Sequence, residues 1–164
     1  MLMNTKFLPW RAFASALLRV GRDGLTGLWD RAAFAALAEK HLRRSGKEGL
    51  LLLVADIDGF KRINDTLGHP FGDMLLKQAA AVFAAVPHAA AGRLGGDEFG
   101  LLLPTSKAIG LHTVCGRIRK DMDKLGLSVS IGTACSRRGQ KDFYSLYLRA
   151  DQMLYAEKEH RIFL

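Results

Sequence analysis

The pattern of apolar and polar positions predicts helices that alternate with a small number of strands. Residues 50–55 (LLLLVA) form an unbroken apolar run between a turn and acidic residues, and a run of this length is typical of a strand buried on both faces. Residues 127–135 alternate with a period of two and carry small residues on one face, which indicates a second strand. Residues 93–103 predict a β-hairpin that turns at Gly95 and Gly96, because glycine reaches positive φ at little steric cost.

Between these predicted strands, apolar residues recur at helical spacing, which predicts helices there. The first such segment includes Phe34, and Asp30 is a suitable N-cap for it. The order of elements predicts an α/β fold of the α+β sandwich type, in which helices flank a central mixed sheet. Four further helices are expected over residues 58–65, 73–86, 106–125 and from 142 onward, with a break between the first two at Gly68 and Pro70.

The first twenty residues have the spacing of an amphipathic helix over residues 10–20. Pro9 and Arg11 interrupt the apolar residues, so neither a signal peptide nor a membrane span is expected. We interpret residues 1–21 as a connector helix, which either mediates self-association or packs on its own domain, and residues 22–164 as that domain.

Size and charge narrow the class of protein only in part. A chain of 164 residues is most simply one domain and is long enough to bury a core without disulfides. The net charge of +8 attracts nucleic acid, anionic lipid or nucleotide phosphates and does not choose among them. No block of five like charges is present, so no arm dedicated to nucleic acid is expected. The two cysteines, Cys115 and Cys135, form no CxxC pair and fit a protein of the reducing cytoplasm.

Four acidic residues lie at two junctions that are typical of a metal site. Asp56 and Asp58 follow the buried strand, and Asp97 and Glu98 follow the Gly-Gly turn. Carboxylates at neighbouring strand ends suit magnesium, a hard cation that prefers oxygen ligands. Two such ions would hold a triphosphate, lower the pKa of an attacking hydroxyl and neutralise a leaving pyrophosphate. The alternative is that the first two acids cap a helix and the other two decorate a turn.

The segment RLGGDEF at residues 93–99 resembles the signature of the GGDEF family of bacterial signalling enzymes. The resemblance is collinear over about residues 22–160, which makes it far more specific than the pentapeptide alone. It implies a fold related to nucleotidyl cyclases and the polymerase palm. The implied activity is that of a diguanylate cyclase, which condenses two GTP into cyclic di-GMP and two pyrophosphates across a homodimer. Further matching segments are DGLTGLWDR (23–31), DIDGFKRINDTLGHPFGD (56–73), SIGTA (130–134) and ADQMLYAEK (150–158).

The resemblance also implies a metal centre with two Mg²⁺ (or Mn²⁺) ions in each half-site. Asp56, Glu98 and the backbone carbonyl of Ile57 would bind the metals, and Asp97 would lie beside them. Asp56, Asp97 and Glu98 are therefore the expected catalytic residues. Neighbouring side chains of a strand point to opposite faces, so the sequence does not divide the metal-binding and proton-accepting roles between Asp97 and Glu98.

The resemblance implies that four residues contact the GTP nucleotide. Gly95 and Gly96 would face the nucleotide, and Asn64 and Asp73 would read the guanine edge. A carboxylate matches two N–H donors of guanine and rejects the acceptor of adenine, which argues against a cyclic GMP-AMP synthase. As an alternative or additional role, Asp73 would cap the helix over 73–86.

Three further residues are implied on the phosphate side. Phe60 and Lys61 lie in the turn expected to wrap the phosphates, although Lys61 is alternatively a solvated lysine. Lys158 continues the buried stripe of the last helix, where a lysine either reaches water or meets an anion, and the family places a triphosphate contact there.

Two departures from the family pattern bear on function. The arginine usual four residues after the lysine is replaced by Ile162, and Arg161 precedes it, which predicts weaker substrate binding. Residues 86–89 (VPHA) stand where many members carry an inhibitory RxxD site, so we expect no product inhibition through that site.

The leading hypothesis is therefore an active diguanylate cyclase with GTP as substrate, controlled by a sensor or receiver domain outside this chain. The alternative is a catalytically weak or inactive GTP-binding module that regulates a partner. A general nucleic-acid binder is suggested only by the charge and is not favoured.

Overall fold

The computed structural model describes residues 21–44, 49–107 and 110–162. The connector helix expected over residues 10–20 lies outside the described residues. The side chains of Arg161 and Ile162 lie outside them as well, so the expected loss of a phosphate contact there stays a prediction.

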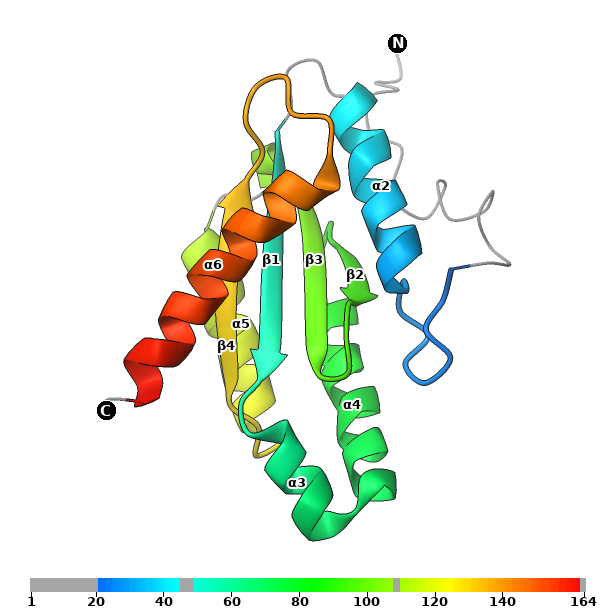
Figure 1. Ribbon diagram of the computed structural model, residues 1–164, viewed down its shortest axis with the longest axis vertical. Helices are drawn as coiled ribbons and strands as arrows, with labels where there is room; N and C mark the ends of the chain where they lie inside the picture. The colour runs from blue at the N-terminus through cyan, green and yellow to red at the C-terminus, as the bar shows by residue number, and fades with distance from the viewer. Residues whose placement is uncertain (1–20, 45–48, 108–109, 163–164) are drawn as a thin grey trace, which may run out of the picture.

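A four-stranded sheet with the order β2-β3-β1-β4 forms the centre of the domain (Figure 1). All its pairings between named strands are antiparallel. Parallel pairing in the described part of the chain is confined to the isolated bridge between Trp29 and Gly92. The elements are α2 (Arg31–Arg44), β1 (Leu50–Ile57), α3 (Phe60–Leu67), α4 (His69–Ala84), β2 (Ala90–Arg93), β3 (Glu98–Pro104), the short 3-10 helix η1 (Thr105–Lys107), α5 (Leu111–Asp123), β4 (Val129–Cys135) and α6 (Phe143–Ile162).

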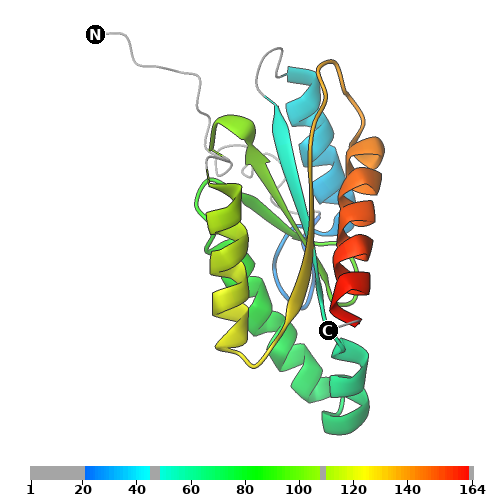
Figure 2. The same cartoon turned by 90° about the vertical axis from the view of Figure 1, so that its left-hand side faces the viewer.

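Helices cover both faces of this sheet, which confirms the expected α+β sandwich, although its four described strands pair antiparallel rather than as the expected mixed sheet. Alternate residues of β1 divide between two apolar clusters, as the period of a strand requires. Leu51 and Leu53 pack toward α4 and α5, whereas Leu50 and Leu52 pack toward α2 and α6. Figure 2 shows these two helix pairs on opposite sides of the strands. The unbroken apolar run of β1 is thus explained by burial on both faces.

The helix expected from residue 73 begins four residues earlier, at His69. Gly68 is its N-cap residue and Pro70 lies in its first turn, where the fixed φ of proline fits and no N–H is needed. The sequence interpretation of Pro70 as a breaker was therefore wrong, and so was Asp73 as an N-cap, because Asp73 lies inside α4. Similarly, α5 begins at Leu111 rather than 106, after the short 3-10 helix.

The hairpin exists, but its turn differs from the expected one. Residues 94–97 connect β2 to β3, and the N–H groups of Leu94 and Gly95 both donate to the carbonyl of Glu98. Neither Gly95 nor Gly96 adopts a positive φ. The prediction that this turn needs glycine for a positive φ was therefore wrong. The lack of a side chain at these two positions matters instead, because it leaves room next to the turn.

Candidate active site

Strand β1 ends next to α3, at one end of the sheet (Figure 1), and the carboxylates predicted to act together belong to residues near this end. Asp56 near the end of β1 is the register partner of Glu98, the first residue of β3. Both continue the face of their strand that is covered by α2 and α6. The N–H of Ile57 donates to the carbonyl of Asp97 at 3.2 Å, which fixes the backbone of Asp97 beside the end of β1. The antiparallel register thus brings together Asp56 and Glu98, which are 42 residues apart in the chain.

The carboxylate of Asp56 is neutralised by a lysine from the last helix. Nζ of Lys158 lies 2.7 Å from Oδ1 of Asp56, whose side chain is 20% exposed. Burial raises the pKa of Asp56 above its usual value; the Lys158 ammonium opposes this rise, and the charges of Asp97 and Asp58 add to it. The ion pair with Lys158 therefore offsets the unfavourable burial of the Asp56 charge only in part.

Glu98 is held by a residue that the sequence did not indicate. The hydroxyl of Tyr147 on α6 donates to Oε1 of Glu98 at 2.7 Å. Burial and this hydrogen bond raise the pKa of Tyr147 far above its usual value, so the phenol keeps its proton and acts as a donor. The other oxygen, Oε2, lies over Gly95, where an added Cβ would be 3.1 Å from it.

Asp58 is bound by two serines of the neighbouring strand segment. The hydroxyls of Ser128 and Ser130 donate to its two carboxylate oxygens at 2.8 and 2.7 Å. Gly59 is the N-cap residue of α3 and no side chain caps this helix. The alternative that Asp56 and Asp58 cap a helix is therefore wrong, and Asp58 instead ties the end of β1 to β4.

Asp56 and Asp58 border a cleft of about 780 Å³, a volume within the range of about 300–1,000 Å³ that is usual for small-molecule sites, whereas Asp97 and Glu98 do not line it. Arg62 points to this cleft although sequence analysis did not select it, and Lys61 does not line it. The start of α3 sets which of these two neighbours faces the cleft. Because the helix begins at Phe60, two residues later than expected, the sequence did not show which one it would be. The lining residues are Asp56, Asp58, Gly59, Arg62, Ser128, Ser130 and Lys158.

Phe60 and Lys61 do not lie in a turn, as the sequence had suggested, but in the first turn of α3. The Phe60 side chain is 6% exposed and belongs to the core cluster beneath α4 and α5, whereas Lys61 is exposed. Any contact of Phe60 with a ligand would therefore involve its backbone.

The two residues expected to read guanine lie on the adjoining helices α3 and α4. Asn64 packs against the backbone of Gly72, where a Cβ would overlap with Oδ1 of Asn64. Asp73, the next residue, is exposed. Oδ1 of Asn64 is buried and has no hydrogen-bond partner, and an unpaired buried acceptor is unfavourable unless a ligand supplies a donor. The structure thus brings Asn64 and the Gly72–Asp73 backbone together, outside the lining of the acidic cleft.

The turn of the hairpin is open to a ligand. Gly95 and Gly96 are exposed, and an added Cβ at Gly96 would meet no heavy atom within 4 Å. Arg93 orders this turn, because its guanidinium donates to the carbonyl of Gly96 at 2.7 and 3.1 Å and forms an ion pair with Asp23 at 3.2 Å. The space beside Gly96 is therefore not filled by side chains, whereas the Glu98 side chain lies beside Gly95.

The donor set fits magnesium, provided that other oxygens complete the coordination. No three His, Cys, Asp or Glu side chains within the described ranges lie close enough to hold a metal by themselves. Asp56 and Glu98 supply two carboxylates at paired strand ends. Mg²⁺ is commonly bound through one or two carboxylates, with phosphate oxygens and water as the remaining ligands.

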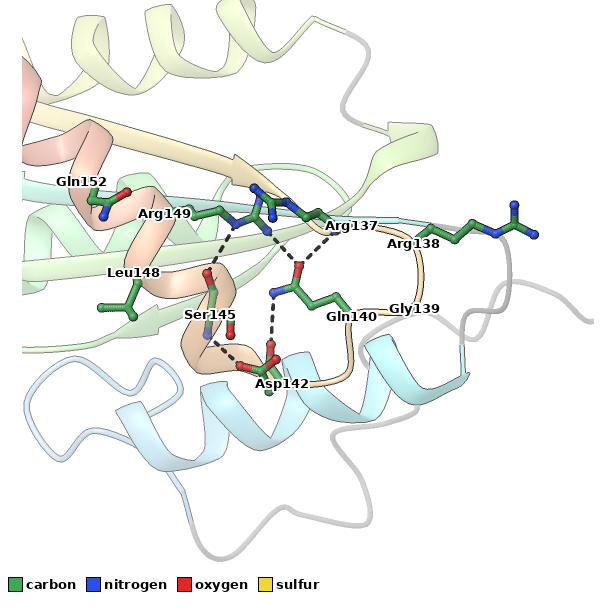
Figure 3. A pocket seen from close by; sticks show the side chains of 9 residues that line it. All are labelled: Arg137, Arg138, Gly139, Gln140, Asp142, Ser145, Leu148, Arg149 and Gln152. Carbon is green, nitrogen blue, oxygen red and sulfur yellow. Dashed lines mark hydrogen bonds between the residues drawn. The ribbon is translucent and has the colours of Figure 1, made fainter.

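A second hollow of about 520 Å³ lies at the other end of α6, beside the β4–α6 loop (Figure 3). Arg137, Arg138 and Arg149 line it, and Arg149 donates to Oε1 of Gln140 at 2.8 Å. Fifteen residues of α6 separate Phe143 from Lys158, or about 22 Å at the usual helical rise. None of the predicted site residues lines this hollow, so it is separate from the acidic cleft.

The fold and the site define an α+β domain with paired carboxylates at one end of an antiparallel sheet and glycines in the adjoining turn. The family model described as "Diguanylate cyclase, GGDEF domain" matches residues 20–162. The chain belongs to this family, as the motifs had indicated.

Individual relatives agree with this assignment. Diguanylate cyclase A of Treponema denticola is 34% identical over 154 residues, which cover 84% of this chain and 42% of that protein. The cyclic di-GMP phosphodiesterase PdeR of Escherichia coli is 31% identical over 147 residues, covering 84% of this chain and 22% of that protein. The solved coiled coil and GGDEF domain of DgcB from Caulobacter crescentus, in complex with c-di-GMP, superposes with a TM-score of 0.81 at 32% identity, covering 92% of this chain and 87% of that one.

The chain spans less than half the length of these curated relatives. Among the described helices, none has the length and apolar character that crossing a bilayer requires.

Proposed function

We propose that this domain is a diguanylate cyclase, which condenses two GTP into cyclic di-GMP with release of two pyrophosphates. The observation that carries the proposal is the pairing of Asp56 with Glu98 at the end of the sheet, beside an open glycine turn and a lysine from α6. The similarity to diguanylate cyclase A of Treponema denticola, at 34% identity, supports the same activity.

Asp56, Glu98 and the carbonyl of Ile57 are the groups that would hold Mg²⁺ or Mn²⁺, two ions in each half-site. When bound, the metal would stabilise charge on the phosphates and lower the pKa of the ribose 3′-hydroxyl. The chain's own contribution is a fixed, partly buried pair of carboxylates whose charge Lys158 offsets only in part. Asp97, close enough to raise the pKa of Asp56, would share with Glu98 the acceptance of the hydroxyl proton.

The triphosphate would be bound by the cations that line the cleft. Lys158 would exchange its ion pair with Asp56 for a phosphate oxygen, and Arg62 lies beside it. The uncapped N–H groups at the start of α3, at Phe60 and Lys61, are suited to phosphate oxygens. Gly95 and Gly96 would let the nucleotide approach the turn closely.

The base would be bound between α3 and α4. Oδ1 of Asn64 lacks a hydrogen-bond partner, and the exposed Asp73 lies next to the glycine that Asn64 contacts. A guanine edge offers N–H donors to both groups. This pair of acceptors favours guanine over adenine.

The reaction needs two domains, because each would supply one GTP and the hydroxyl of one must reach the α-phosphate of the other. A homodimer is therefore part of the proposal, as is an upstream sensor or receiver domain outside this chain. A reducing cytoplasm, where GTP is found, is in keeping with the two free cysteines.

Replacement of Asp97 or Glu98 by alanine tests the assignment. We expect cyclic di-GMP formation from GTP and Mg²⁺ to fall at least about 100-fold in each variant, since residues that touch the reacting groups contribute on this scale. Product is measured by chromatography, and Asp123→Ala at the exposed end of α5 is the control. Unchanged product formation in both variants would refute the cyclase.

The second candidate is a GTP-binding module without turnover that regulates a partner. The similarity to a protein named a phosphodiesterase favours it, as does Ile162 in place of the usual arginine. Tight GTP binding with no product at high protein concentration would decide for this candidate.

A further inference from the structure

Two side chains of α6 engage the two carboxylates of the proposed metal site. Tyr147 donates to Glu98 and Lys158 forms an ion pair with Asp56, each at 2.7 Å. These two residues are eleven positions apart. Eleven residues are close to three full helical turns, so both side chains leave the same face of the helix. One face of α6 therefore contacts both strand ends.

The two contacts differ in how easily a bound ligand would break them. Lys158 is a flexible cation that a metal or phosphate would displace from Asp56. Tyr147 is a neutral donor on a stiff side chain whose ring is held on two sides. The ring of Phe143 lies 5.8 Å away, one turn earlier, and the guanidinium of Arg31 lies 5.1 Å from the ring centroid. Tyr147 is thus suited to stay in place when the site is loaded.

The hydroxyl of Tyr147 distinguishes the two oxygens of Glu98. Oε1 accepts the hydrogen bond, and Oε2 lies on the side of Gly95, in the open turn. Only Oε2 is then directed toward a ligand in that turn. A carboxylate fixed in this way offers one oxygen rather than two.

We infer that Tyr147 is a positioning residue that makes Glu98 a single-oxygen ligand and so selects Mg²⁺ over Ca²⁺. Mg²⁺ requires near-ideal octahedral geometry, whereas Ca²⁺ accepts six to eight oxygens and often takes both oxygens of one carboxylate. Holding Oε1 away from the metal therefore disfavours the larger ion. The inference rests on the proposed metal site but not on turnover, because a module that binds metal and GTP without reacting would show the same preference.

Tyr147→Phe removes the hydroxyl and keeps both ring contacts. Tyr155→Phe is a matched control, because Tyr155 is an exposed tyrosine of α6 that is hydrogen-bonded to Glu159 rather than to Glu98. Each chain is loaded with Mn²⁺ and 3′-deoxy-GTP, which lacks the attacking hydroxyl. Free Mn²⁺ is then followed by electron paramagnetic resonance as Mg²⁺ or Ca²⁺ is added, with the nucleotide alone as blank.

We expect the Ca²⁺-to-Mg²⁺ ratio of displacing power to rise about tenfold in Tyr147→Phe and to stay unchanged in Tyr155→Phe. Loss of a group that orients a metal ligand commonly changes metal affinity by about 10–100-fold. Ca²⁺ inhibition of product formation should strengthen in parallel. Should Tyr147→Phe fail to fold, Tyr147→Met, which also lacks a donor and fills an apolar space, takes its place.

The outcomes separate the two proposals. An unchanged displacement ratio in the Tyr147 variant overturns the role of Tyr147, even where activity falls. Mn²⁺ binding with a shifted ratio but without product from GTP overturns only the cyclase. No Mn²⁺ binding by the unaltered chain, beyond that of the nucleotide blank, overturns both.

Discussion

Asp56 carries a charge that its surroundings in the folded domain disfavour. Its side chain is 20% exposed, and the charges of Asp97 and Asp58 act against its ionisation. Lys158 offsets this only in part, since the pKa of Asp56 remains raised. A site that binds cations gains from such an excess of negative charge, and the same excess lowers the stability of the fold by itself.

Asp56→Asn should stabilise the domain and abolish activity. Below about pH 3.8, the ordinary pKa of the group, Asp56 is protonated in both the folded and the unfolded chain and has no cost. As the pH rises, the unfolded chain ionises first, so the stability of the unaltered protein falls until the raised pKa of the folded state has been passed. The advantage of Asp56→Asn should therefore grow with pH and reach about 1 kcal/mol at pH 7.

Urea unfolding of both proteins from pH 3.5 to 7 measures this difference. A variant that is no more stable than the unaltered chain at pH 7 would show that Lys158 compensates Asp56 fully.

At the scale of elements, the close approach of α6 to β4 decides where Lys158 and Tyr147 lie. Gly132 in the middle of β4 makes this approach possible, because a Cβ there would meet the carbonyl of Ala150 and the backbone N of Leu154. On the far side of β4, Arg119 of α5 binds Glu157 of α6 at 2.8 Å. This ion pair thus connects α5 and α6, which cover opposite faces of the sheet, around the edge strand β4.

Gly132→Ala should push α6 away from β4. Overpacking of a tight contact typically costs about 1–3 kcal/mol, and the displacement of Lys158 should also raise the KM for GTP. Denaturant unfolding and substrate titration measure the two effects.

Gly116→Ala is the matched control, because Gly116 lies within α5 and a Cβ there would meet no atom within 4 Å. Alanine should stabilise that helix by about 0.5–1 kcal/mol. Equal effects of the two substitutions would contradict the proposed contact between β4 and α6.

In the described part of the whole molecule, one domain offers one acidic cleft and the single pair, Asn64 and Asp73, that we propose to bind guanine. If catalysis requires a dimer of domains, the rate of product formation per chain depends on the fraction of chains that are dimeric. The net charge of +8 opposes the meeting of two copies, so bound nucleotide, which is anionic, should favour it.

The rate of cyclic di-GMP formation should therefore rise faster than linearly with chain concentration. At concentrations well below the dissociation constant of the dimer, doubling the chain should increase the rate about fourfold, by mass action. Initial rates over a dilution series with saturating GTP and Mg²⁺ measure the order. A strictly linear rate over the whole series would mean that one chain suffices or that the dimer never dissociates.

Much of the fold could be predicted because it depends on local patterns in the sequence. The run at residues 50–55, the alternation at 127–135 and the helix cap at Asp30 each depend on near neighbours, and the structure confirms them. Errors occurred where two local signals competed. Pro70 was read as the end of a helix, although the same residue is favourable in the first turn of α4. Gly95 and Gly96 were read as a positive-φ turn, although their backbone does not need it.

The family and the types of side chain at the proposed site follow from the amino-acid sequence, because a collinear set of motifs records which residue types the chemistry needs. How those side chains meet depends on the packing of elements that are far apart in the chain. The pairing of β1 with β3 places Asp56 opposite Glu98, and the packing of α6 brings Tyr147 to Glu98 across 49 residues of chain. No local pattern marks Tyr147, since a tyrosine on the inner face of a helix is an ordinary core residue. Its role depends on the register between a helix and a strand, which long-range packing sets.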